Sequence, residues 1–484
     1  MRPRRTEALL LAIGLCLAGG AAARTVADWQ LMEVWLNGQH MDSFAPLVQI
    51  DGQWHAPATD LRRWRLQPPG AGMRVHGETV HPLQAWQPVL DTATQRLQLQ
   101  APVDDFDPQA LRVGGDARDT PLTRSSPGLA LDHSVNIDHD TDGTRAAALL
   151  ELRGFGWPGG GVLHHSGVLR AGGLMPSEGR WLRLDTAWRH HDPQTLRRTT
   201  VGDSVSCGGE LAPTVRFAGA QVQTDFGLRP DLVTHPLPSV RGSATVPSGI
   251  DLLVNRQPAG SVNVGPGAFS LESLPTLTGA GEIQIVQRDL LGVEQVRSVP
   301  YYISPRLLRP GLSDHCAEVG VLRRSHGLRS ADYRDGFAAY ALRHGLDERF
   351  TVLGRVALGR QVRSLHLGLH ALPGAASPLG VFSAQLSHSQ ADGVGSGHSA
   401  RLRFERVDRQ RSLSAAIEHA GPRFRLEDGS RPPTRRATLF TGWNAGATSW
   451  SAGAVWQRGA APGMPRGVPM RGGTQASTRG RTAA

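Results

Sequence analysis

Few residue patterns in this chain have the type and spacing of a metal or catalytic site. Histidines occur as adjacent pairs at His164-His165 and His190-His191. Neighbouring residues on a strand point to opposite faces, whereas a metal ion needs ligands that converge. We therefore interpret both pairs as loop histidines or as histidines that line a channel, and we expect no metal site.

Two further motifs resemble chemical sites only superficially. Gly202-Asp203-Ser204-Val205 matches the start of one esterase motif, but no partner Asp and His can be placed for it. The turn Gly265 to Ser270 is rich in glycine, but no helix follows it, so it is not a phosphate-binding loop. The sequence thus predicts no catalytic residues and no cofactor, and we expect that the protein is not an enzyme.

The most regular pattern of short strands lies between Ile250 and Pro300. Runs rich in branched residues alternate with Gly and Pro turns, and apolar residues recur at every second position, as in Phe269 and Leu271. Strands this short with turns this frequent predict a small β-sandwich. The expected strands are Ile250–Val254, Phe269–Leu274, Ile283–Val286 and Val293–Val299.

Segments on both sides of this sandwich alternate strictly between apolar and polar residues. In one segment Leu365, Leu367 and Leu369 alternate with Ser364, His366 and His370. The same alternation is found for Leu402 and Phe404 against Arg401, Arg403 and Glu405, and for the face formed by Trp450, Ala452, Ala454 and Trp456. Such strands fit a soluble antiparallel sheet or an outer-membrane barrel with an apolar outer face. The persistence of the strands and the tryptophans near their ends favour the barrel; a secreted β-rich surface protein is the alternative.

The two ends of the chain account for much of its net charge of +10. A basic start, an apolar run from Ala8 to Ala18 and a small-residue site at Ala23 predict a cleaved secretory signal. The segment from Gly459 onward is basic and of low complexity, and we expect it to be disordered. The body of the chain is too mildly charged to bind nucleic acid. We therefore expect an exported protein.

Two cysteines, Cys207 and Cys316, remain after removal of a signal that contains Cys16. An oxidising compartment permits a disulfide between them. We nevertheless favour two free or buried thiols, and the sequence does not decide the point.

The first hundred residues after the signal have a character of their own. The strand in LMEVWLNGQ places Leu31, Glu33 and Trp35 on one face. The stretch APATDLRRWRL predicts a short helix that Thr59 or Asp60 caps. Two more strands surround a turn at Asp91 to Thr94. Together these elements predict a small α+β domain.

The order of motifs between about Leu182 and Leu358 resembles the outer-membrane ushers of chaperone–usher fimbriae. The first domain resembles, more loosely, the usher N-terminal domain of the divergent branch that serves archaic-type pili. The matching pieces are Gly202-Asp203, Val215–Gln221, Arg229-Pro230-Asp231, Arg241-Gly242, VNRQPAGSVNVGPGAFSLESLP, Tyr301-Tyr302, Leu308–Gly311 and Arg343–Leu346. Within the sandwich, the plug motif consists of Asn255, Gly260, Gly265, Pro266, Gly267 and Phe269.

The resemblance implies a mainly β protein in the bacterial outer membrane: a transmembrane antiparallel β-barrel with an inserted β-sandwich plug and a small α+β periplasmic domain. The domain limits are 1–23 for the signal peptide, 24–124 for the periplasmic domain, 125–240 for the first barrel strands, 241–303 for the plug, 304–458 for further barrel strands and 459–484 for the tail. The implied partners are periplasmic chaperone–pilin complexes and outer-membrane lipid, without nucleotide or nucleic acid. Pilins would assemble by donor-strand exchange. We assign chaperone binding to Leu31, Glu33 and Trp35.

The lengths on either side of the plug predict about sixteen to eighteen barrel strands at ~10 residues per strand plus turns. Because ushers have more strands and C-terminal domains, we expect a truncated usher with an incomplete barrel and impaired secretion. An outer-membrane porin or transporter with a periplasmic domain is the alternative.

Overall fold

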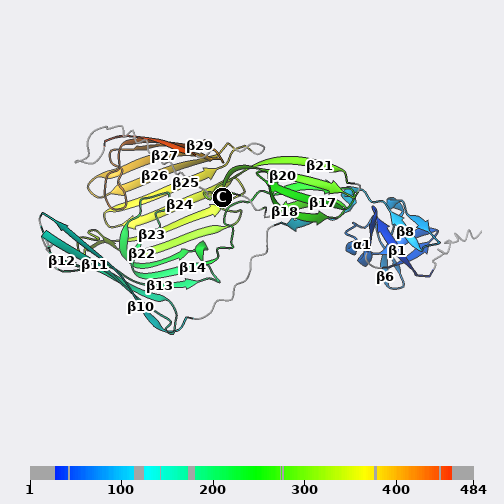
Figure 1. The fold of residues 1–484 in the computed structure, drawn as a ribbon, viewed down its shortest axis with the longest axis horizontal. Coiled ribbons are helices and arrows are strands. Elements are labelled where there is room, and N and C mark those ends of the chain that lie inside the picture. The colour runs from blue at the N-terminus through cyan, green and yellow to red at the C-terminus, as the bar shows by residue number, and fades with distance from the viewer. Residues whose placement is uncertain are drawn as a thin grey trace, which may run out of the picture.

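The structure is a computed structural model. It describes residues 28–41, 44–113, 125–141, 143–172, 180–272, 274, 277–290, 292–374, 379–445 and 448–459. The predicted signal peptide and nearly all of the predicted tail lie outside these residues. The described chain forms three β-rich units: a first domain, a large antiparallel sheet and a sandwich inserted into it (Figure 1).

The first domain is a small α+β domain, as the sequence predicts, but its sheet has eight strands where the sequence predicts three. Its strand path is β5-β6-β4-β3-β1-β8-β7, and β2 pairs with β1. Val34, Leu36, Leu47 and Trp86 form part of its buried core. The elements are β1 (Gln30–Leu36), β2 (Gln39–His40), β3 (Ala45–Ile50), β4 (Gln53–Pro57), α1 (Ala58–Arg63), β5 (Met73–Val75), β6 (Glu78–Pro82), β7 (Val89–Asp91) and β8 (Arg96–Leu99), with 3-10 turns at Gln84–Trp86 and Val103–Asp105.

The start of helix α1 differs from the sequence prediction. Pro57 is the N-cap, and no side chain caps the helix. Thr59 and Asp60 instead lie inside the first turn. Proline suits this position because its φ is already near the helical value and its missing N–H is not needed there. The helix is too short to reach the predicted Leu66, since Arg65 has a φ of 61°.

The large sheet has fifteen strands in sequential order, each antiparallel to the next. β15 pairs directly with β22, so the chain between them is an insertion. Within the described residues the terminal strands β10 and β30 each have one neighbour. The strands are β10 (Gly128–Asp140), β11 (Gly143–Phe155), β12 (Val162–Ala171), β13 (Trp181–Asp192), β14 (Arg197–Val205), β15 (Arg216–Thr224), β22 (Ser313–Arg323), β23 (Tyr333–Gly345), β24 (Phe350–Gly359), β25 (Val362–Ala371), β26 (Val381–Ala391), β27 (Gly395–Val407), β28 (Arg411–Ala420), β29 (Arg435–Ala445) and β30 (Thr448–Arg458).

The strand count among the described residues is lower than the sequence estimate of sixteen to eighteen. The estimate assumed about ten residues per strand. Several strands are longer than this: β10, β11, β23 and β27 each contain 13 residues. Longer strands absorb the same length of chain in fewer crossings.

Apolar and polar residues alternate across this sheet as predicted. On β25, Leu365, Leu367 and Leu369 remain 46%, 56% and 38% exposed, whereas Ser364, His366 and His370 are buried. An inverted arrangement of this kind, with leucines exposed and histidines buried, is costly in water and suits a lipid-facing outer surface. No helix among the described residues has the length and hydropathy needed to cross a bilayer.

The insertion, together with β9 from the chain that follows the first domain, forms the predicted β-sandwich. One sheet has the order β16-β19-β9 and the other β18-β17-β20-β21. Ile250, Leu252, Phe269, Leu271 and Ile283 meet in its buried core. Its strands are β9 (Gln109–Arg112), β16 (Val240–Ala244), β17 (Ser248–Val254), β18 (Gln257–Val264), β19 (Gly267–Glu272), β20 (Gly279–Asp289) and β21 (Glu294–Ile303).

The four strands expected between Ile250 and Pro300 are present, but the sequence missed β9, β16 and β18. β18 contains Pro258 and Gly260, which are poor strand residues, and its pairing with β17 is irregular between Leu252 and Leu253. Figure 1 shows the sandwich beside one end of the large sheet, with the first domain on its far side.

Candidate functional site

The three residues assigned to chaperone binding share the outer face of β1. Leu31 is 63% exposed, and Glu33 and Trp35 are half-buried, whereas Met32, Val34 and Leu36 point into the core. The Trp35 indole N–H donates to Glu33 Oε1 at 2.9 Å. The alternation of one strand therefore presents a leucine, a carboxylate and an indole side by side.

Two basic side chains from neighbouring strands complete this surface. The guanidinium of Arg96, on β8, lies 4.8 Å from the centre of the Trp35 ring. His40 Nε2 lies 3.0 Å from Glu33 Oε1. We call the set Leu31, Glu33, Trp35, His40 and Arg96 the β1 surface. The indole is fixed by a hydrogen bond and by a cation–π contact, so it is ordered before any partner binds.

The pKa of Glu33 is lowered from its ordinary value. The largest cause is the hydrogen bond from Trp35, and the positive charges of Arg96 and His40 act in the same direction. Glu33 is therefore ionised throughout the neutral range. A partly exposed aromatic ring beside an arginine and a fixed carboxylate has the composition of a protein-binding surface.

The plug motif separates into residues that build the sandwich and residues that reach the first domain. Phe269 is buried in the sandwich core. Asn255 has a φ of 53° in the turn between β17 and β18, and its Oδ1 accepts from the backbone N–H of Glu282 at 3.1 Å. Gly260 lies in the irregular part of β18 with a φ of 152°.

The turn Gly265-Pro266-Gly267 packs against the first domain. Arg65 Nη2 donates to the carbonyl oxygen of Pro266 at 3.0 Å, and the N–H of Gly265 donates to Gln109 Oε1 at 3.3 Å. Gly267 has a φ of 115°, and a Cβ there would lie 2.6 Å from Phe106 Cβ. Both its conformation and its close contact require glycine. The sequence identified this turn but not the surface that it contacts.

A short strand joins the first domain to the sandwich. β9 follows the first domain in the chain and pairs in parallel with β19, from Phe269 opposite Gln109 to Glu272 opposite Arg112. Asn37 Nδ2 also donates to the carbonyl oxygen of Thr245 at 2.9 Å. Sequence patterns could not reveal this junction, because β9 has only four residues and its partner is more than 150 residues away.

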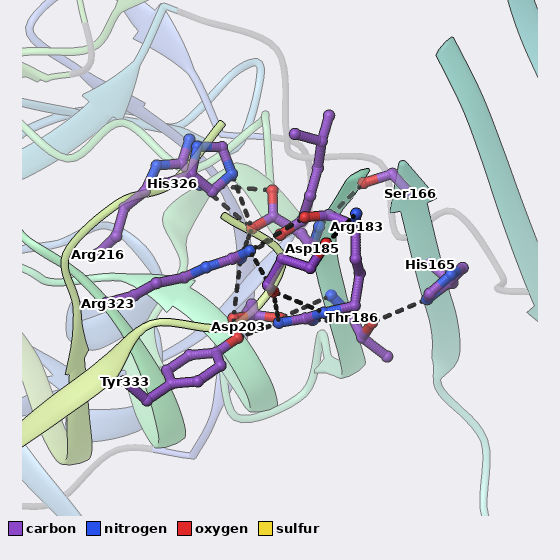
Figure 2. A network of polar contacts seen from close by, with 12 residues as sticks. His165, Ser166, Arg183, Asp185, Thr186, Asp203, Arg216, Arg323, His326 and Tyr333 are labelled. Carbon is purple, nitrogen blue, oxygen red and sulfur yellow. Dashed lines mark hydrogen bonds and ion pairs between the residues drawn. The ribbon is translucent and has the colours of Figure 1, made fainter. Parts of the chain in front are cut away.

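A network of charged side chains lies at the end of the large sheet remote from the sandwich (Figure 2). Asp203, on β14, is 4% exposed. Its carboxylate accepts from Arg183, from the Tyr333 hydroxyl and, at 3.2 Å, from Arg323 Nη1. The Thr186 backbone N–H donates to Asp203 Oδ2 at 2.9 Å. Asp203 is two residues from both Val201 and Val205 on β14, and both valines are exposed. Residues two apart on a strand share a face, so Asp203 lies on the outward face.

The loop 324–332 buries this network. The Ser330 carbonyl oxygen accepts from Arg183 Nη2 at 3.0 Å and from Arg323 Nη2 at 3.1 Å. His326, from the same loop, lies 3.4 Å from Asp185. The loop between β22 and β23 is thus fixed over strands β13 and β14. Asp203 of the Gly202-Asp203 motif therefore anchors the loop 324–332 through the arginine and tyrosine side chains that surround it.

A second charged cluster lies on the inward face. Arg355 is 1% exposed and forms ion pairs of 2.7 Å with both Glu318 and Glu427. Glu427 belongs to the loop between β28 and β29, so this loop folds inward. Because an unpaired buried charge is very unfavourable, the arginine and its two carboxylates fix the loop and two strands together.

Cys207 and Cys316 form a disulfide, so the preference for separate thiols was wrong. They are 109 residues apart in sequence, on either side of the inserted sandwich. The pairing of β15 with β22 brings Cys316 opposite Gln223, and the chain after β14 turns back so that Cys207 reaches it. Across the described residues, the histidine pairs at 164–165 and 190–191 contribute to no cluster of metal-ligating atoms.

An antiparallel sheet with an apolar outer surface, interrupted by a sandwich between two paired strands, defines an outer-membrane β-barrel with a plug. The family model described as "Outer membrane usher protein" matches residues 178–425, and the chain belongs to this usher family. This family is an assembly platform and secretion channel rather than an enzyme family.

Curated relatives match part of the chain. "Outer membrane usher protein FimD" of Escherichia coli K12 is 26% identical over 217 residues, which cover 45% of this chain and 24% of that protein. The "F1 capsule-anchoring protein" of Yersinia pestis is 25% identical over 37% of this chain and 21% of that protein. The matches thus span about a quarter of the length of these relatives.

A solved structure has the same fold over most of the chain. It is the E. coli P pilus tip assembly intermediate PapC-PapD-PapK-PapG, with a TM-score of 0.53 and 16% identity. The similarity covers 90% of this chain and 58% of that chain.

Proposed function

We propose that this chain is an outer-membrane usher that recruits chaperone–pilin complexes, promotes donor-strand exchange between pilins and secretes the growing fimbria through its barrel. The observation that carries the proposal is the insertion of the sandwich between β15 and β22, which pair directly with each other. Because the two flanking strands pair with each other, the inserted domain can move into the pore or out of it without breaking the hydrogen bonds of the wall.

The sandwich and the first domain form one continuous assembly beside the pore wall. β9 pairs with β19, and Arg65 and Asn37 donate to the sandwich backbone. In this arrangement the sandwich lies outside the large sheet, next to the first domain, to which we assign the binding of chaperone–pilin complexes. The proposed domain roles are recruitment for 24–124, the pore wall within 125–240 and 304–458, and the plug for 241–303, with 1–23 as the export signal.

Recruitment is assigned to the β1 surface. Trp35 offers apolar area while its N–H bonds to Glu33, and Leu31 extends this area. Glu33 offers a fixed negative charge to a basic partner. Binding at such a surface depends mainly on its central aromatic residue.

Assembly on this chain needs no nucleotide and no catalytic residue. Donor-strand exchange replaces one β-strand by another in the groove of a pilin, and the energy comes from the new strand pairing. The membership of the usher family and the inserted sandwich weigh against the alternative of a simple porin or transporter.

The test is capture of a purified chaperone–pilin complex by the detergent-solubilised full chain. Trp35→Ala and Glu33→Gln should weaken capture, with Trp35→Ala at least tenfold weaker, in line with a central aromatic contact. Thr79→Ala is the control, because Thr79 is also exposed on the first domain but lies on β6, three strands away from β1 in the sheet. If wild type and both variants capture the complex equally well, the binding site would be sought at α1 instead. If wild type captures no complex, the recruitment role is refuted. Restored piliation of an usher-deficient strain tests secretion.

A further inference from the structure

The outward face of the last four strands carries two parallel rows of side chains. Leu402, Ile417, Ala437 and Trp456 lie directly opposite one another across β27, β28, β29 and β30, and we call them the apolar row. Leu402, Ile417 and Trp456 are each more than 50% exposed. A groove of about 410 Å³ runs along this row, with small Ala437 between the larger residues.

The cationic row lies two residues further along the same strands. It consists of His419, Arg435 and Arg458, which are again direct neighbours in register. All three side chains are exposed, and His419 and Arg435 border the groove. Two residues along a strand correspond to ~7 Å, so positive charge lies immediately beyond the apolar groove.

The facing pair Arg435 and Arg458 is unfavourable without an anion. Like charges directly opposite on neighbouring strands repel each other. Among the described residues, neither guanidinium forms an ion pair or a side-chain hydrogen bond. On the inward face of the same wall, by contrast, Arg401 forms an ion pair with Glu418 at 2.8 Å.

The two rows lie at the end of the wall remote from the sandwich. The insertion leaves the wall after Thr224 and returns at Ser313. Arg435 begins β29 and Arg458 ends β30, at the other end of the strands. Under the proposed function, in which the first domain faces the periplasm, this end lies in the outer leaflet.

We propose that the two rows form a binding site for a phosphorylated, acylated glycolipid of the outer leaflet. Its phosphate lies between Arg435 and Arg458, where two planar guanidinium groups offer paired donors, and His419 supplies a further ring N–H. One acyl chain fills the groove above Ala437 against Trp456. The proposal rests on the proposed function for the orientation of the barrel, whereas the chemistry of the site comes from the two rows.

The test measures binding of diphosphoryl lipid A, and of its dephosphorylated form, to the full chain in detergent by native mass spectrometry. Wild type should retain the phosphorylated lipid. Arg435→Gln together with Arg458→Gln should weaken its binding at least tenfold, as the loss of a charge-assisted pair of bonds implies. Arg411→Gln is the control for position: it removes one positive charge from the same outward face of the wall, on β28 opposite Trp443, at the other end of the strands.

Further variants separate the two parts of the site. Ala437→Leu should fill the groove and weaken binding while both arginines remain. The proposal is overturned if the dephosphorylated lipid binds equally well, if Arg411→Gln weakens binding as much as the double variant, or if millimolar inorganic phosphate alone displaces the lipid. Heat-modified migration in SDS gels confirms that each variant is folded.

The orientation is tested separately. Ser430→Cys, in the loop between β28 and β29, should react with a membrane-impermeant maleimide on intact cells. Lack of reaction in cells that contain the folded protein would overturn the outer-leaflet assignment. Loss of lipid binding with retained labelling and retained chaperone capture would overturn the lipid site and leave the proposed function intact.

Discussion

Arg65 and Pro266 are 201 residues apart in sequence, and the Arg65 guanidinium donates to the Pro266 carbonyl oxygen at 3.0 Å. The same guanidinium donates to the carbonyl oxygen of Asp107 at 2.9 Å. One side chain from the first domain therefore holds both the segment that leads into β9 and the turn of the sandwich. This contact fixes the sandwich beside the first domain.

We expect Arg65→Ala to loosen this junction. The variant loses hydrogen bonds worth about 0.5–1.5 kcal/mol each, so the pairing of β9 with β19 should open more often. Hydrogen exchange followed by mass spectrometry should show faster exchange in residues 107–113 and 265–272. Arg62→Ala is the control, because the Arg62 side chain donates within its own helix, to the Ala58 carbonyl oxygen at 3.2 Å. Unchanged exchange in the Arg65 variant would show that the junction does not depend on this contact.

Gly267→Val should disturb the junction more strongly than Arg65→Ala. A Cβ at this position meets Phe106 at 2.6 Å, and a β-branched residue strains a φ of 115°. We expect the whole segment 107–113 to lose protection from exchange. Gly292→Val is the comparison: Gly292 also has a positive φ, but a Cβ there would have no atom within 4 Å. It therefore reports the effect of backbone strain without a steric contact. Equal effects of the two variants would contradict a specific contact at Gly267.

The β1 surface should make the first domain sensitive to acid. The folded pKa of Glu33 is lowered, chiefly by the Trp35 hydrogen bond, so its contribution to stability is present above the unfolded pKa and is lost as the pH falls through the folded value. Urea unfolding of the first domain, followed by tryptophan fluorescence, should shift to lower urea between about pH 5 and pH 3. Glu33→Gln should show a smaller shift, and Asp104→Asn, an exposed change in the same domain, should behave as wild type. An equal acid shift in the Glu33 variant would refute this role.

Asp203→Asn should destabilise the end of the wall where loop 324–332 lies. The carboxylate is buried between Arg183 and Arg323, and removal of one partner from a buried ion pair typically costs about 3–5 kcal/mol. The temperature at which the folded band is lost in SDS gels should fall. Asp132→Asn removes an exposed ion pair with Arg153 from the same sheet and should change little. If the two variants lose the folded band at the same temperature, the network around Asp203 does not stabilise the sheet.

The disulfide predicts that no thiol of the described chain is reactive before reduction. In a Cys16→Ser background, maleimide labelling of the unfolded, unreduced protein should add no label, and reduction should expose two. Cys207→Ser should yield one reactive thiol without reduction. Two labels on the unreduced Cys16→Ser protein would contradict the Cys207–Cys316 bond.

The sequence by itself determined the local elements and their faces. Alternation along β25 and β27 indicated one apolar face suited to lipid, because a strand places successive side chains on opposite sides. The same rule placed Leu31, Glu33 and Trp35 together on β1. The order of motifs indicated the usher family and the position of the inserted sandwich. All of these signals are short-range or depend on order along the chain.

Only the tertiary structure decided which distant segments meet. The Cys207–Cys316 bond, the pairing of β9 with β19, the contact of Arg65 with Pro266 and the facing arginines Arg435 and Arg458 all join segments that lack a common periodicity. Strand register fixes these contacts, and register depends on the whole set of cross-strand pairs rather than on any one strand. Asp203 shows the difference well: its motif was visible in the sequence, but its two arginines and tyrosine were brought to it by the fold.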